Sequence, residues 1–144
     1  MVACVNPGKY GLNKTAQMRT ILVIDDDPAF LGETQNLLGG AGYRVLQAAD
    51  GIRAARLFEE LRGAIDLAII DLALPGLNGY ELIGALSRRP NSVKIIATSG
   101  VFKDSQLECA TAVGAHAVIR KPPNLKALPR QQWLNTVQQL IGEP

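Results

Sequence analysis

The sequence predicts an α/β fold in which helices cover both faces of a five-stranded parallel sheet, a doubly wound arrangement. Five short segments rich in β-branched residues alternate with helical segments, and this alternation is typical of parallel sheets. The strand segments are nearly continuous apolar runs, as expected for strands buried on both faces. A chain of 144 residues that is 47% hydrophobic and 19% charged has the size and composition of one globular domain.

Each predicted element carries a local signal. The five strands are bounded by turn residues and are expected over residues 20–24, 43–48, 66–70, 93–98 and 116–120. The first helix, over 28–40, begins at Pro28, which suits a first helical position, and ends at Gly39 and Gly40. The second helix, over 51–62, follows Asp50, which is a good N-cap.

The helical segments also predict which side chains face the core. We expect the helix over 51–62 to place Ile52, Ala55, Leu57 and Phe58 on one side. Two further helices are expected over 79–89 and 104–115. A last helix over 129–142 begins at Pro129 and carries Trp133, Leu134, Val137 and Leu140 on one face. Trp133 and Cys109 are interpreted as packing residues.

Composition excludes several classes of function. A net charge of +2 predicts neither nucleic-acid nor membrane binding. Cys4 and Cys109 form neither a metal-spaced pair nor a disulfide framework. The apolar runs are too short to span a bilayer, and the N-terminus has no signal-peptide pattern. We therefore expect a cytoplasmic protein.

The first 18 residues differ from the rest of the chain. Glycine, proline and asparagine interrupt any periodicity there, which predicts a flexible N-terminal extension over 1–18 and a domain over 19–144. The stretch GKYGLNKT, Gly8 to Thr15, is similar to a phosphate-binding P-loop with Asn13 in place of the second glycine. No strand precedes it, so we do not expect nucleotide binding there.

Polar side chains stand where the predicted strands end. Asp25 and Asp26 follow the first strand, Asp71 the third, Ser99 the fourth and Lys121 the fifth. Ligands of open α/β sheets bind outside the carboxyl ends of the strands, so these side chains are expected to share one crevice. A few hard oxygen ligands with room for water and phosphate suit Mg²⁺. The sequence therefore predicts a magnesium site at this edge.

These segments also carry a resemblance. ILVIDDDP, DLALPGLNGYEL, KIIATSG and KPP, with AADGIRAARLFEE between the first two, resemble the successive signatures of the receiver domain of two-component response regulators. The resemblance runs from about Arg19 to the C-terminus. It implies a flavodoxin-like five-stranded sheet of order 2-1-3-4-5 with five helices. It also implies a stand-alone, chemotaxis-regulator-like phosphoacceptor served by a sensor histidine kinase or histidine phosphotransfer protein, with an unknown downstream protein target.

The resemblance assigns roles to individual residues. Asp71, which opens the pattern D-x-x-L-P-x-x-x-G, would be the phosphoacceptor. Asp26 would ligate Mg²⁺ directly, Asp25 through water or a hydrogen bond, and the backbone carbonyl of Ala73 would complete the protein ligands. Ser99 would contact the phosphoryl group, in preference to Thr98 because of its spacing to the lysine. The paired lysine would be Lys121, with a cis bond to Pro122.

The chain departs from the family pattern at several positions. Val118 stands where an aromatic residue is usual three positions before the lysine, and Pro123 replaces another aromatic. Ala73 and Val101 are apolar at positions that flank the phosphoryl group, and neither can orient a hydrolytic water. We therefore expect slow dephosphorylation. The segment KPPNLKALPRQQ before the last helix is unusually long and proline-rich.

Simpler interpretations remain open for each residue. The acids at 25–27 could merely favour a helix N-terminus, as Asp27 is expected to do. Asp71 could cap a turn, Ser99 could be a loop hydroxyl and Lys121 a solvated charge.

Two other functions of the chain also stay open. One is a receiver-like interaction module that works without phosphorylation. The other is a magnesium-dependent phosphohydrolase, which would need an acid where Ala73 stands. We expect a signalling domain, not an enzyme, whose only catalysis is its own phosphorylation and dephosphorylation.

Overall fold

A twisted parallel sheet forms the centre of the chain in the computed structural model, which describes residues 18–76, 78–89, 93–100 and 104–144. Its strands lie in the order β3-β2-β4-β5-β6 and are all parallel. The strands are β2 (Thr20–Ile24), β3 (Arg44–Ala48), β4 (Leu67–Asp71), β5 (Lys94–Ser99) and β6 (Ala117–Arg120). When the five strands are numbered from 1 along the chain, this order is 2-1-3-4-5, so the predicted arrangement is confirmed.

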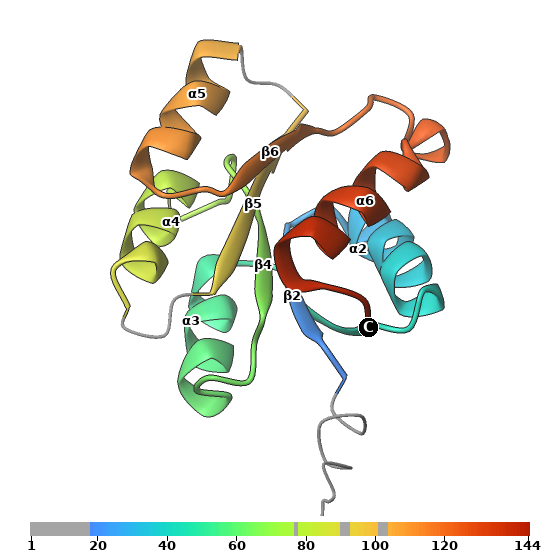
Figure 1. Cartoon of the computed structure of the whole chain (residues 1–144). Helices are drawn as coiled ribbons and strands as arrows, with labels where there is room; N and C mark the ends of the chain where they lie inside the picture. The colour runs from blue at the N-terminus through green and yellow to red at the C-terminus, as the bar shows by residue number, and fades with distance from the viewer. Residues whose placement is uncertain (1–17, 77, 90–92, 101–103) are drawn as a thin grey trace, which may run out of the picture.

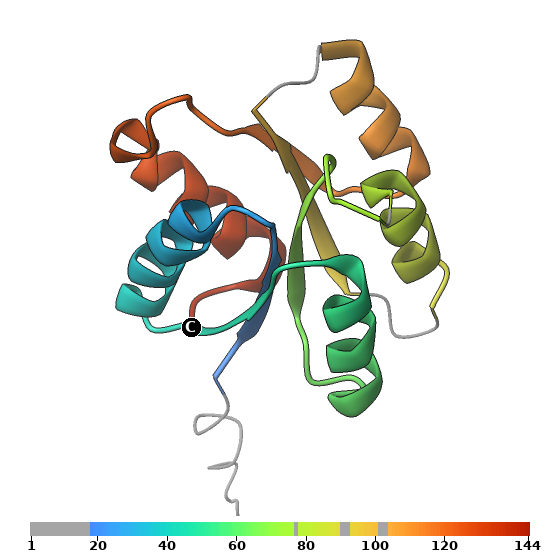
Figure 2. The same cartoon turned by 180° about the vertical axis from the view of Figure 1, so that it is seen from behind.

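Helices cover both faces of this sheet, as Figures 1 and 2 show from opposite sides. One face carries α2 (Pro28–Thr34) with its π-helical continuation η1 (Gln35–Gly39), and α6 (Arg130–Ile141). The other carries α3 (Gly51–Glu60), α4 (Gly79–Ser87) and α5 (Asp104–Val113). A short 3-10 turn, η2 (Leu125–Ala127), precedes α6. No described helix has the length and apolar character needed to cross a membrane.

Two apolar clusters fill the space between sheet and helices, because successive strand side chains point to opposite faces. Ile21 and Val23 of β2 join Phe30, Trp133 and Val137 under α2 and α6. On the opposite face, Leu22 and Ile24 of β2 pack with Ala54 and Phe58 of α3 and with Ile83 of α4. Both clusters therefore depend on the same strands, and β2 and β4 are buried along their whole length.

Helix starts follow the local signals read from the sequence. Asp27 is the N-cap of α2, where its carboxylate accepts a hydrogen bond from the Ala29 N–H at 3.0 Å, and Pro28 opens the helix. Asp50 caps α3 in the same way, accepting from the Arg53 N–H at 2.7 Å. Both predictions are confirmed, including the capping role expected for Asp27.

Two details of the helices differ from the prediction. The buried side of α3 holds Gly51, Ala54, Leu57 and Phe58, whereas Ile52 is 73% exposed and Ala55 is exposed. Residues 51, 54 and 58 lie within one helical stripe, whereas residues 52 and 55 are each turned by about 100° from the buried residue that precedes them. In α6, Pro129 is the N-cap and not the first helical residue, while Trp133 and Val137 are buried as expected.

Some predicted features lie outside the described residues. These are nearly all of the expected extension over 1–18, including the P-loop-like stretch Gly8 to Thr15 and Cys4, and also Val101. Cys109 is described and is an exposed free thiol, so its expected packing role is wrong.

Candidate phosphoryl-transfer site

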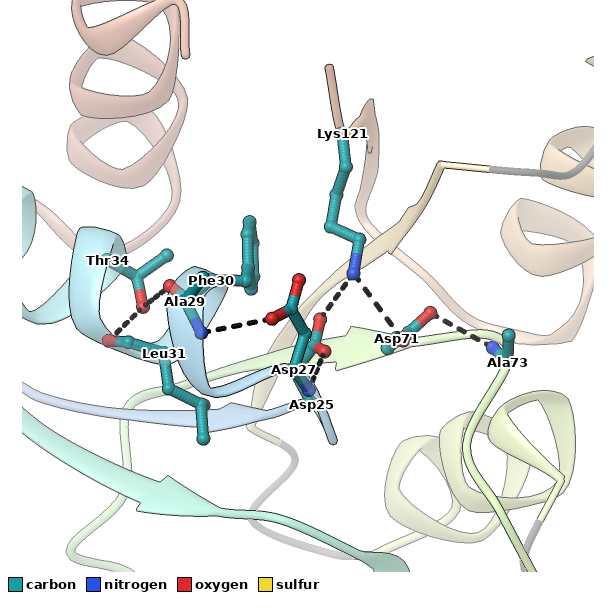
Figure 3. A network of polar contacts seen from close by, with 9 residues as sticks. All are labelled: Asp25, Asp27, Ala29, Phe30, Leu31, Thr34, Asp71, Ala73 and Lys121. Carbon is teal, nitrogen blue, oxygen red and sulfur yellow. Dashed lines mark hydrogen bonds and ion pairs between the residues drawn. The ribbon is translucent and has the colours of Figure 1, made fainter. Parts of the chain in front are cut away.

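The polar residues predicted to share one crevice do meet at the carboxyl end of the sheet. Asp25 follows β2, Asp71 and Ser99 are the last residues of β4 and β5, and Lys121 follows β6. The four side chains come from strands adjacent in the sheet, because β4 pairs with both β2 and β5 and β6 pairs with β5. Figure 3 shows Asp25, Asp71 and Lys121 pointing toward one another.

Asp25 is the most deeply placed of the acids, with no exposed surface. One carboxylate oxygen accepts from the Asp27 N–H at 2.8 Å, and the other accepts from Lys121 Nζ at 2.8 Å. Its backbone N–H donates to the carbonyl of Ala48 at the end of β3, which fixes the turn out of β2. Burial raises the pKa of Asp25, and the nearby charge of Asp71 adds to the rise, although both hydrogen bonds oppose it.

Lys121 joins the two buried acids. Its Nζ lies 2.8 Å from Asp25 Oδ2 and 3.6 Å from Asp71 Oδ2, and the side chain is 13% exposed. Burial alone would lower the pKa of Lys121, but the hydrogen bond to Asp25 and the surrounding carboxylate charges outweigh burial and raise it. The ammonium therefore stays charged and partly offsets two carboxylates at once.

Asp71 is 4% exposed and ends a fully buried strand. Its Oδ1 accepts from the Ala73 N–H at 3.0 Å, which orients the carboxylate, as Figure 3 shows. The next residue, Leu72, donates its N–H to the carbonyl of Thr98 and so extends the pairing of β4 with β5. The carboxylate is thus held at the rim of the sheet by backbone contacts.

Three carboxylates gather closely enough to share one cation. Asp25, Asp26 and Asp71 each offer an oxygen, and these oxygens lie within 4.8 Å of one another. Asp26 is exposed, so the cluster opens to solvent on one side. A compact set of carboxylate oxygens with open positions for water fits Mg²⁺. The burial of Asp25 beside Asp71 supports this fit, because a divalent cation would relieve their repulsion.

Ser99 and Thr98 lie side by side at the end of β5 but face opposite ways, as neighbours in a strand do. Ser99 is 1% exposed, and its carbonyl accepts the Lys121 N–H at 3.1 Å. Thr98 is fully buried, and its hydroxyl has no hydrogen-bond partner within the described part of the chain. Ser99 therefore lies at the same end of the sheet as Asp71 and Lys121.

The peptide bond between Lys121 and Pro122 differs from the prediction. The described residues contain no cis peptide bond, so the expected cis form is wrong. The trans isomer is the more stable one before proline by about 0.5–1 kcal/mol. Lys121 reaches both acids with the trans bond in place.

Sequence reasoning missed an aromatic neighbour of the site. The ring centroid of Phe30 lies 4.7 Å from Lys121 Nζ, and the Phe30 ring in turn packs on Trp133. Both positions show only the apolar periodicity of a core helix face, so no signal in the sequence distinguishes them from ordinary packing residues. Val118, by contrast, is partly buried against the cluster under α3, α4 and α5, as a small side chain in place of an aromatic one.

Comparison with known proteins agrees with this geometry. A family model described as the response regulator receiver domain matches residues 21–131. Response regulator GtcR of Aneurinibacillus migulanus is 34% identical over 115 residues, which cover 79% of this chain and 46% of that protein. The chain therefore belongs to the response regulator receiver domain family.

Solved structures show the same architecture. A putative response regulator from Chloroflexus aurantiacus aligns with a TM-score of 0.76 and 26% identity, covering 88% of this chain and 99% of that one. A chain of the CheX-CheY-BeF3-Mg+2 complex from Borrelia burgdorferi aligns with a TM-score of 0.77 over 92% of this chain and 97% of that one, at 21% identity, which supports the fold alone.

Family membership carries general properties but not the activity of the longer relatives. Receiver domains are phosphoacceptor signalling domains of two-component systems, and they bind Mg²⁺ in an acidic pocket of the kind seen here. The family interacts with histidine kinases and phosphotransfer proteins. The chain spans less than half the length of the curated relatives, 12% of a sensor kinase and 46% of GtcR among them.

Proposed function

We propose that this chain accepts a phosphoryl group on Asp71 from a sensor histidine kinase or a histidine phosphotransfer protein. One observation carries the proposal. The Asp71 carboxylate lies at the carboxyl end of the sheet, with Asp25 and Asp26 oxygens within 4.8 Å and Lys121 Nζ at 3.6 Å. Phosphoryl transfer depends mainly on positioning and on neutralising charge, and this arrangement supplies both.

The residues divide the work as follows. A carboxylate oxygen of Asp71 attacks phosphorus, the bond from phosphorus to the donor histidine nitrogen breaks, and the imidazole leaves with the electron pair. Mg²⁺ held by Asp25, Asp26, Asp71 and the Ala73 carbonyl would supply positive charge against the acceptor and the phosphoryl oxygens. Lys121 adds a second positive charge beside Asp71, with Nζ at 3.6 Å from its carboxylate, and the Ser99 hydroxyl would meet the transferred group.

Phosphorylation would then act as a signal. An acyl phosphate on Asp71 adds charge and strong hydrogen-bond acceptors beside Lys121 and Ser99, which can shift the balance between two arrangements of the surrounding surface. The output would be phosphorylation-dependent binding of a downstream protein or passage of the group along a relay. We place this exchange in the cytoplasm, where an ATP-dependent kinase would supply the phosphoryl group.

Acetyl phosphate provides a direct test, because it replaces the kinase with a small phosphoryl donor. We expect an intact-mass spectrum to show one phosphoryl adduct on the wild-type chain with Mg²⁺ and none on Asp71→Asn. Adduct formation on Asp71→Asn at the wild-type level would contradict the assignment.

A second function has support from one position. Val118 leaves the site without an aromatic on β6, which favours a module that binds its partner without phosphorylation. Such a module would form no adduct while still binding Mg²⁺, and calorimetric titration with Mg²⁺ alone separates this outcome from a misfolded site.

A further inference from the structure

An aromatic pair lies directly beside the Lys121 ammonium. The Phe30 ring centroid is 4.7 Å from Nζ, and the rings of Phe30 and Trp133 are 5.9 Å apart at an interplanar angle of 60°. Phe30 belongs to α2 and Trp133 to α6, and neither has exposed surface. Figure 3 shows the Phe30 ring between α2 and Lys121.

We propose that Phe30, backed by Trp133, is a positioning residue for Lys121 and that Trp133 responds when the ammonium changes its partner. The inference rests on the proposed phosphorylation of Asp71. Nζ is now closer to Asp25, at 2.8 Å, than to Asp71, at 3.6 Å. To contact a phosphoryl group on Asp71, the ammonium shifts away from Asp25 across the face of the Phe30 ring.

Such a shift has an electrostatic effect on the ring. A cation within about 6 Å of a ring centroid is attracted by the negative face of the π-system, and the attraction is larger where water is excluded. Phe30 is buried and Lys121 is mostly buried, so the contact is little screened. The ring therefore keeps Nζ over its face, so that the ammonium stays within reach of both Asp25 and Asp71.

Trp133 is placed to follow the Phe30 ring. Its indole N–H is buried and has no hydrogen-bond partner in the part of the chain that the structure describes. The indole is thus held by packing alone, without a polar contact that would fix its orientation. Lys121 is also joined to α6 through residues 122–129, and η2 in that segment contacts α2. The Lys121 ammonium is therefore connected to α6 in two ways, through the rings of Phe30 and Trp133 and through the chain that follows Lys121.

A matched pair of variants separates this role from ordinary packing. Phe30→Leu removes the ring but keeps apolar bulk in the core. Phe58→Leu makes the same change at a buried residue of α3 on the opposite face, where the guanidinium of Arg89 lies 5.9 Å from the ring centroid. Both changes remove a buried aromatic ring with a nearby cation, but only the first is at the site.

The experiment follows Trp133 emission and adduct mass together after addition of acetyl phosphate and Mg²⁺. Trp133 is the only tryptophan of the chain, so its emission is unambiguous. We expect wild-type emission to change as the adduct forms. In Phe30→Leu we expect most of this change to be lost and adduct formation to slow by about threefold, the size expected for one cation–π contact. Phe58→Leu should match the wild type in both.

Two results would overturn the inference. One is a Phe30→Leu chain with the wild-type rate and emission change, and the other is an equal loss in both variants. If the wild type forms no adduct, the proposed function fails separately. The emission change on titration with Mg²⁺ alone then decides whether Phe30 positions Lys121, because Mg²⁺ competes with Lys121 for Asp25. Dependence of that change on Phe30 supports the role, and independence refutes it.

Discussion

Charged side chains are buried at one end of the parallel sheet and exposed at the other. At the carboxyl end, Asp25 and Asp71 are buried, with Lys121 nearly so. At the amino end, Arg19, Arg44 and Lys94 stand before or at the start of their strands and are exposed. Burying a charge costs free energy that an exposed charge does not incur. The carboxyl end therefore bears a cost that folding alone does not require, which indicates a functional site.

Removing the metal should cause the largest difference between the two ends. We expect chelation of Mg²⁺ to slow adduct formation from acetyl phosphate by about 100-fold, because several kcal/mol of charge stabilisation are lost. Asp66 at the amino end accepts the Thr20 N–H at 2.8 Å and has no place in the site. Time-resolved intact mass should therefore show that Asp66→Asn retains the full magnesium dependence. An unchanged rate in chelator would contradict the cation site.

Removing Lys121 should destabilise the fold far more than removing an exposed lysine. Lys121→Met leaves two buried carboxylates without their cation, which we expect to lower the free energy of unfolding by about 3 kcal/mol in the absence of Mg²⁺. Lys94→Met at the amino end should change it by less than about 0.5 kcal/mol. Urea unfolding monitored by circular dichroism measures both.

The loss of stability in Lys121→Met should depend on pH in a defined direction. Burial raises the pKa of Asp25 in the folded state, so the stability it contributes is present at low pH and is lost as pH rises through the folded pKa. Lys121 opposes that rise through its hydrogen bond. The loss in Lys121→Met should thus be larger at pH 8 than at pH 5, and a pH-independent loss would count against a buried charged pair.

Dephosphorylation should be slow because Ala73, exposed two residues after Asp71, offers no group to orient water. We expect Ala73→Asn to shorten the lifetime of the adduct about tenfold by positioning the attacking water. Ala55→Asn, at an exposed position of α3, is the control. Decay of the adduct mass after removal of acetyl phosphate gives both lifetimes, and a lifetime of seconds that Ala73→Asn leaves unchanged would refute the idea.

The smallest effect belongs to the amino end. Burial lowers the pKa of His116 below its ordinary 6.5, with a further contribution from Lys94, and His116 Nδ1 accepts the Ile95 N–H at 3.1 Å. Because the pKa of His116 is lower in the folded state, the stability it contributes is present above the unfolded pKa and is lost as pH falls through the folded pKa. Imidazole NMR should show the pKa rising in Lys94→Met. No change there would mean that solvent screens this charge fully.

The sequence predicted the features that depend on local pattern. The strand β2, the caps Asp27 and Asp50 and the sheet order follow from periodicity, turn chemistry and the family resemblance, and they are confirmed. Placing Asp25, Asp71 and Lys121 together also follows, because all parallel strands end at one edge.

Other features depend on contacts that no local pattern records. The exposed Ile52 results from the exact phase of α3 against the sheet, which an amphipathic pattern defines only loosely. The contact of Phe30 with Lys121 joins α2 to the loop after β6, and only the tertiary structure brings those segments together. The trans bond before Pro122 shows that a family expectation can fail at a single residue.

Borohydride trapping tests the central claim most directly, because it converts a phosphorylated aspartate to homoserine at the residue that carried the phosphoryl group. After treatment with acetyl phosphate and Mg²⁺, we predict that fragment masses place homoserine at Asp71 and at no other acid. Homoserine at Asp25 or Asp26, or its absence from a chain shown to bind Mg²⁺, would contradict the account.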